Sequence, residues 1–194
     1  LEAYPLHPGL LHFYVHNLEL HPADYASISA QSLATLETCA PMAGHLIHMP
    51  SHVYVLLGDW EGAIRSNSCA VEADEAFVAA RARDTFYGLY RIHDYHMGAY
   101  AAMMSGRLVD ARRFSQGMLA AGCMPSRAGL GLGAGDPLWH YTEPYLSVDW
   151  HVMTRFGLWD EILATGVLPS SDAVPLEDGD PSPEALFLTY AATA

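Results

Sequence analysis

The chain has 194 residues, of which 51% are hydrophobic and 16% charged, and this composition predicts one globular domain, 1–194, rather than a disordered segment. Its formal net charge of −13 at pH 7, with only nine Lys and Arg residues, argues against nucleic-acid partners and anionic membrane surfaces. No apolar run reaches the roughly 20 residues of a membrane span, so we expect a soluble protein with no membrane span.

Apolar residues recur at helical spacing through most of the sequence, and no run of alternating β-branched residues predicts a strand. The predicted fold class is therefore all-α. A Gly-rich connector is expected at 122–138 and a Pro-rich, acidic one at 169–183. Helices are expected at about 9–20, 23–38, 42–57, 60–74, 84–104, 108–121, 139–156 and 159–166, with a last one from about 183.

A short template recurs three times, beginning at Gly58, Gly106 and Gly157: Gly, any residue, an aromatic or Leu, two further residues, then a small or apolar residue. In tetratricopeptide units this is the turn between two helices. The Gly ends helix A, the large residue fills the space between the pair, and the small residue lets helix B approach. The template predicts an α-solenoid of antiparallel helical hairpins, with copies further apart than the usual period of about 34 residues.

Histidine is the conspicuous residue type, with eleven copies. Seven of them and one glutamate fall into three groups whose members are one or two helical turns apart, so each group points to one side of its helix. The groups are His12, His16 and Glu19; His45, His48 and His52; and His93 with His96.

We expect these three groups to converge on the concave groove of the hairpin stack. Neutral imidazole binds zinc, copper and iron, and a carboxylate can complete the donor set. The eight residues therefore predict a transition-metal site, with copper or zinc favoured and iron fitting a face of two histidines and one carboxylate. One ion with outer partners and two neighbouring ions both fit this number of donors.

Two further residues are assigned to the same site. His7, one residue before Pro8 at a helix start, is expected to bend back toward it. Pro50 lies between His48 and His52 and lacks the N–H of a regular helix, so it predicts a kink that sets how His52 points. A metal-free polar network, or a histidine cluster titrating near pH 6.5, is the alternative interpretation.

The segments HPGLLHFYVHNLE (7–19), AGHLIHMPSHVY (43–54) and RFGLWDEIL (155–163), with Asn67 and the turn at Gly58, resemble a group of tetratricopeptide-repeat proteins. That group carries the motifs HPGxxHxxxH and HxxHMPSH. The resemblance implies a superhelix of helical hairpins and a chain that is the middle of a longer protein. It implies no reaction.

Three functions remain open at this point. The first is a metalloenzyme, hydrolytic or oxidative, whose metal polarises a substrate, forms a hydroxide nucleophile or activates oxygen. The second is a scaffold that binds a peptide or another small ligand in its groove, and the third is metal storage or delivery. Expected partners are the metal ion, that groove ligand, and the rest of a longer chain or neighbouring subunits. The three cysteines match neither a disulfide framework nor a thiolate zinc site.

Overall fold

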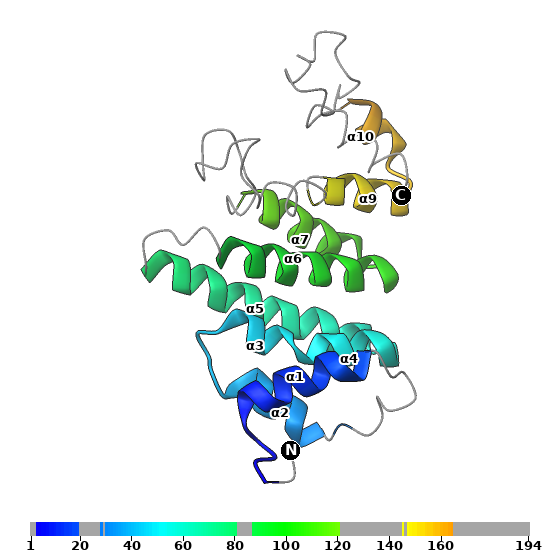
Figure 1. Ribbon diagram of the computed structural model, residues 1–194. Coiled ribbons are helices and arrows are strands. Elements are labelled where there is room, and N and C mark those ends of the chain that lie inside the picture. Colours follow the sequence, from blue (N-terminus) through cyan, green and yellow to red (C-terminus); the bar gives the residue numbers. More distant parts are fainter. Residues whose placement is uncertain are drawn as a thin grey trace, which may run out of the picture.

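The computed structural model shows a stack of helices that runs from α1 and α2 at one end to α9 and α10 at the other (Figure 1). It describes residues 3–19, 28, 30–80, 87–120, 145 and 147–164. Within these residues all regular structure is helical, which confirms the all-α prediction for this part of the chain. The helices are α1 (Pro8–Glu19), α2 (Ala30–Thr38), α3 (Gly44–His48), α4 (Pro50–Leu57), α5 (Trp60–Ala80), α6 (Tyr87–Met104), α7 (Leu108–Ala120), α9 (Val148–Arg155) and α10 (Trp159–Ala164).

Several predicted helices differ from the observed ones. The helix expected at 23–38 includes Ile28, which is a bend ahead of α2, and the one expected at 139–156 has 3-10 geometry at Tyr145 and Ser147 before α9 begins at Val148. The helix expected at 60–74 continues to Ala80, because the added residues contain neither Gly nor Pro. The helix expected at 42–57 is divided at Met49, directly before Pro50. Both connectors, at 122–138 and 169–183, and the helix expected from 183 lie outside the described residues. None of the described helices is both long enough and apolar enough to cross a membrane.

The three Gly turns share one backbone geometry. Gly58, Gly106 and Gly157 have φ of 73°, 72° and 68°, a region that favours glycine. At each turn the glycine N–H donates to the carbonyl three residues earlier, and the next N–H donates to the carbonyl five residues before it. This is the Schellman arrangement that ends a helix. The next helix begins two residues after the glycine, so the turns join α4 to α5, α6 to α7 and α9 to α10.

The large and small positions of the template are buried or packed at the first two copies but not at the third. Ala63 and Ala111, the small positions, are fully buried, and Trp60 and Leu108 pack against the same core cluster. Trp159, by contrast, is 58% exposed, and α10 buries none of its residues although it packs on α9. The large residue of the template, such as Trp60 or Leu108, is packed only where further helices cover both helices of the hairpin.

Met49 separates α3 from α4, and both helices lie between α2 and α5, which each of them contacts. Met49 keeps helical angles, φ −49° and ψ −38°, so the chain continues in the same general direction. The His52 N–H donates to the Met49 carbonyl, and Ser66 Oγ on α5 donates to the Ile47 carbonyl at 2.6 Å. Helix α4 packs on α1, while α3 packs on α5 and α6. The helices that carry the three histidine groups are thereby brought together.

Candidate metal centre

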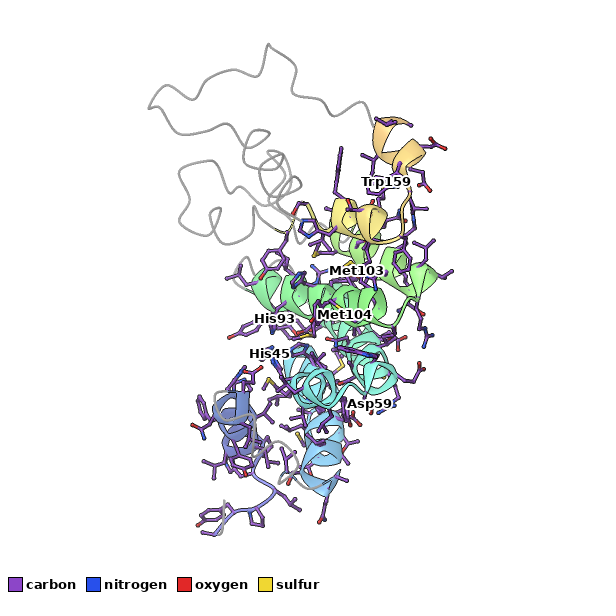
Figure 2. All side chains as sticks on the ribbon, turned by 90° about the vertical axis from the view of Figure 1, so that its right-hand side faces the viewer. His45, Asp59, His93, Met103, Met104 and Trp159 are labelled. Atoms are coloured by element: carbon purple, nitrogen blue, oxygen red, sulfur yellow. The ribbon has the colours of Figure 1, made fainter. Side chains whose placement is uncertain are left out.

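Seven of the eight predicted ligands meet where α1, α3, α4 and α6 come together. Figure 2 shows His45 and His93 on the same side of the stack, on the facing helices α3 and α6. Their ring centroids are 5.8 Å apart. The seven residues are His12, His16 and Glu19 on α1, His45 and His48 on α3, His52 on α4, and His93 on α6.

Five of the imidazoles form a closed ring, each in contact with the next. Centroid distances between successive members are 5.2, 5.5, 4.8, 5.1 and 4.8 Å. His93 lies against three of the five, at centroid distances of 4.5 to 5.8 Å. The order around the ring is His12, His45, His48, His52 and His16.

Several donors are close enough to share an ion. Three sets of three residues have ligand atoms that all lie within 4.8 Å of one another. No set of four is found among the described residues. The sets are His12, His16 and His45; His45, His48 and His93; and His16, Glu19 and His52.

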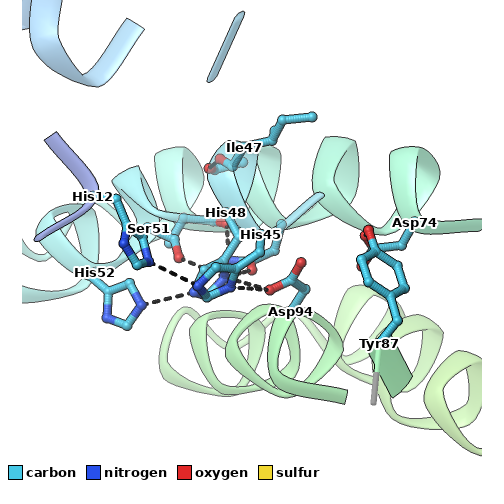
Figure 3. A network of polar contacts seen from close by, with 12 residues as sticks. His12, His45, Ile47, His48, Ser51, His52, Asp74, Tyr87 and Asp94 are labelled. Carbon is cyan, nitrogen blue, oxygen red and sulfur yellow. Dashed lines mark hydrogen bonds and ion pairs between the residues drawn. The ribbon is translucent and has the colours of Figure 1, made fainter. Parts of the chain in front are cut away.

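The hydrogen bonds around His48 and His52 fix which ring nitrogen is protonated. Asn67 Nδ2 donates to the Ala63 carbonyl at 2.9 Å, so its Oδ1 is the acceptor that lies 2.6 Å from His48 Nδ1. His52 Nδ1 is hydrogen-bonded to Glu19 Oε1. Each Nδ1 is therefore a donor in the neutral ring, and the two Nε2 atoms face each other at 2.9 Å, as drawn in Figure 3.

A second pair of neighbouring imidazoles also has facing Nε2 atoms. His12 Nε2 and His45 Nε2 are 3.2 Å apart. His16 Nδ1 lies 3.0 Å from Glu19 Oε2, so the Glu19 carboxylate serves both His16 and His52. Hydrogen bonds from imidazole Nδ1 to a carboxylate or amide are the usual way in which proteins aim Nε2 at a metal.

The electrostatics keep these imidazoles neutral. Burial, together with neighbouring imidazoles, lowers the pKa of His45 to about 3 and that of His93 to about 4. Burial likewise lowers the pKa of His48 well below its usual value, and it lowers the pKa of His52 despite the opposing charge of Glu19. Burial alone would raise the pKa of Glu19, but its contacts with His16 and His52 outweigh burial and lower it. These shifts favour neutral rings at His45, His48, His52 and His93 beside an ionised Glu19 carboxylate.

Neutral imidazoles with one carboxylate are a donor set for zinc, copper or iron. No family model, curated protein or solved structure matches this chain. The indication of metal binding therefore comes from the three donor sets of the structure itself, each of which could hold a metal ion.

His96 and His7 lie apart from the cluster. The His96 ring packs edge-on against Tyr145, with centroids 5.0 Å apart, and burial followed by the charge of His151 lowers the His96 pKa. His96 belongs to none of the three donor sets. His7 is exposed, and its Nδ1 accepts the Leu10 N–H at 3.4 Å, so the expectation that it bends toward the site is wrong. It caps the start of α1 instead.

Two buried carboxyl groups beside the cluster were missed from the sequence. Asp94 is fully buried, and its Oδ1 lies 3.4 Å from His48 Nδ1 and 3.7 Å from His45 Nδ1. Tyr87 Oη donates to Asp74 Oδ1 at 2.6 Å, while no donor reaches Asp74 Oδ2 or either Asp94 oxygen within the described part of the chain. Burial, followed by the charge of the adjacent Asp74, raises the pKa of Asp94 well above its usual value, and burial raises the pKa of Asp74.

A sequence signal for these residues exists. Asn67 and Asp74 are seven residues apart on the face of α5 that also buries Ala63 and Ala70. Asp94 lies on the buried face of α6 with Gly98. Polar residues on an otherwise small and apolar helix face need a partner across the interface.

Proposed function

We propose that this chain binds a transition-metal ion through the imidazole cluster and acts as a metal-dependent enzyme. One observation carries the proposal. Three polar contacts form a series: Asn67 to His48, His48 to His52, and His52 to Glu19. The residues at the two ends, Asn67 and Glu19, are both acceptors. Three contacts need three protons, but two neutral imidazoles supply only two. A cation between His48 Nε2 and His52 Nε2 completes the series.

A third proton is the competing explanation. It would either make one of the two rings an imidazolium or protonate Glu19, whereas burial lowers the pKa of both His48 and His52, and the contacts with His16 and His52 lower the pKa of Glu19. A metal ion needs the neutral rings that burial favours. Two nitrogens bound to one ion at about 2.1 Å stand roughly 3.0 to 3.4 Å apart, close to the 2.9 Å between the two Nε2 atoms.

The donor types narrow the choice of metal. The three donor sets contain imidazole and one carboxylate but no thiolate. Imidazole-rich sites without sulfur favour copper or zinc, and iron fits where two histidines and a carboxylate share an ion. We therefore place copper and zinc first and keep iron as the alternative.

Access to the cluster favours catalysis over storage. The side chains of His16 and Glu19 are 39% and 34% exposed, whereas His48 is fully buried. An ion near α1 can therefore keep a position for water or substrate, as catalytic sites do and closed structural sites do not. Such an ion supports hydrolytic chemistry through a bound hydroxide, or oxidative chemistry if it is copper or iron.

We also propose that the helices form a tetratricopeptide-like solenoid with the cluster in its concave groove. The three Gly turns of equal geometry and the hairpins that they form support this arrangement. So does the resemblance of the HPGxxHxxxH and HxxHMPSH segments to tetratricopeptide proteins. In such arrays the first helices of successive hairpins line one surface.

The test is a competition titration of the whole chain with Zn2+ and Cu2+ against a chromophoric chelator. We expect at least one of these ions to bind in the submicromolar range, and His48→Ala and His52→Ala each to weaken binding at least tenfold. His7→Asn is the matched control, because His7 is exposed and Asn preserves the cap of α1. Binding that is absent, or equally strong in all four proteins, would overturn the proposal.

A further inference from the structure

We propose that the cluster holds two ions, each bound by three imidazoles: one by His12, His16 and His45, the other by His48, His52 and His93. The inference rests on the proposed metal-binding function. It adds how many ions bind, which histidines bind each ion, and which ion solvent can reach. The carboxylate of Glu19 takes the role of a positioning group that orients His16 and His52.

The first argument is the spacing of the donors. Atoms bound to one ion at about 2.1 Å lie within roughly 4.2 Å of one another. The donor sets within 4.8 Å have three members each, and none of four occurs in the part of the chain that the structure describes. The seven residues thus form a chain of overlapping triplets rather than the shell of one ion.

The second argument is the pairing of the Nε2 atoms. They face one another in two separate places, His12 with His45 at 3.2 Å and His48 with His52 at 2.9 Å. Each pair has the separation of two neighbouring ligands on one ion, about 3 Å. No histidine belongs to both pairs, so each pair can start its own site.

The third donor of each site follows from the contacts. His16 falls in one donor set with His12 and His45. His93 falls in one donor set with His48 and His45 but not with His52, and its ring centroid lies 4.5 Å from that of His48 and 5.6 Å from that of His52, so it reaches the second ion from the His48 side. Each ion then has three imidazoles, and every histidine serves one ion.

The contacts of Glu19 decide between this partition and the one in which Glu19 is a ligand. Its two oxygens face Nδ1 of His16 and Nδ1 of His52. If Glu19 bound an ion together with His16 and His52, the facing Nε2 atoms of His48 and His52 would lie on different ions. As an acceptor, Glu19 fixes the tautomer of both rings, as outer carboxylates do at metal sites.

The two sites differ in access. His48 is fully buried and His52 is 7% exposed, whereas His16 is 39% and His45 21% exposed. The ion on the α1 side is therefore the one that exchanges with solvent and takes an outside ligand, such as water or a small anion. The Asp94 carboxyl group lies on the Nδ1 side of His48, at 3.4 Å, and so faces the ring nitrogen that does not bind the inner ion.

The experiment counts ions. The whole chain is stripped with chelator, reloaded with Zn2+ or Cu2+, freed of excess metal and analysed for metal per chain. We expect two ions in the native sequence, and one each in His12→Asn and His93→Asn. His96→Asn is the matched control, three residues from His93 on the same helix but outside every donor set, and it should keep two. Glu19→Gln should also keep two ions, bound about 10- to 100-fold more weakly.

One ion per native chain would overturn this inference and leave the proposed function standing, whereas no ion would overturn both. Loss of an ion in Glu19→Gln would contradict the positioning role. A second measurement needs no variant that must fold. In the Cu2+-loaded native chain, two ions in one cluster should broaden each other's electron paramagnetic resonance through their magnetic dipoles. A spectrum of magnetically isolated copper at full loading would overturn the two-ion centre.

Discussion

Replacing Asn67 by Ala tests whether Asn67 orients His48 toward a metal or only stabilises the fold. Asn67 Oδ1 accepts from His48 Nδ1 at 2.6 Å, and Asn67 Nδ2 donates to the Ala63 carbonyl at 2.9 Å. His48 is fully buried, so leaving its Nδ1 with only the longer 3.4 Å hydrogen bond to Ser51 Oγ costs about 1–3 kcal/mol, and loss of the second bond costs about 1 kcal/mol more. The expected loss of about 2–4 kcal/mol lowers Tm by on the order of 10 °C.

Metal affinity is the decisive readout for this variant. Because Asn67 fixes which nitrogen of His48 faces the cluster, its loss should weaken metal binding about 10- to 100-fold. The matched control is Ser66→Ala on the same helix, which removes a buried hydrogen bond to the Ile47 carbonyl without touching an imidazole. It should cost about 1–3 kcal/mol of stability and leave the affinity nearly unchanged. Thermal unfolding with chelator and metal titration measure both quantities. Equal affinity losses in the two variants would refute the orienting role.

Three other changes probe the fold and the charges around the cluster. Gly44→Ala places a Cβ 2.0 Å from Asp74 Oδ1, so it should destabilise the chain by about 1–3 kcal/mol in chemical denaturation, while Gly9→Ala, with no contact below 3.4 Å, should not. In Gly106→Ala the added Cβ meets no atom within 4 Å, but the residue must keep φ near 72°, so the variant should lose about 1–2 kcal/mol of stability in the same assay. Unchanged stability would show that the turn does not require this φ. The metal-free chain should lose stability as pH falls from about 6.5 to 4. Between these pH values His93 is protonated in the unfolded chain but stays neutral in the folded chain, where its pKa is about 4. This difference lowers the free energy of unfolding by about 3 kcal/mol from this residue alone. Denaturant midpoints that do not move between pH 7 and pH 4.5 would contradict the neutral cluster.

The sequence predicts the helices and the three histidine groups because both depend on local spacing. His12 and His16 are one turn apart on any regular helix, and Gly58 ends a helix wherever a left-handed residue is required. Which groups meet depends instead on which helices pack, and that is set by long-range contacts such as α1 on α4. The convergence of the groups was therefore a hypothesis until the packing was known.

Residues at the edge of the cluster show where local spacing is insufficient. His96 follows His93 by three residues, which rotates it about 60° around α6. That rotation is enough to turn it toward Tyr145 and away from His48. Asp94, between the two histidines in sequence, was passed over because its importance comes from its burial against α3. Burial of a polar residue depends on the neighbouring helix, which spacing along one helix does not reveal.

The central claim is that imidazole nitrogens of this cluster bind a transition metal. X-ray absorption at the edge of the bound metal, recorded on the purified native chain, tests it most directly. The account predicts a first shell of nitrogen or oxygen at about 2.0–2.1 Å, with outer-shell scattering from at least two imidazoles per ion, because His48 and His52 both present Nε2. A sulfur shell near 2.3 Å, a shell without imidazole scattering, or a chain that carries no metal would contradict it.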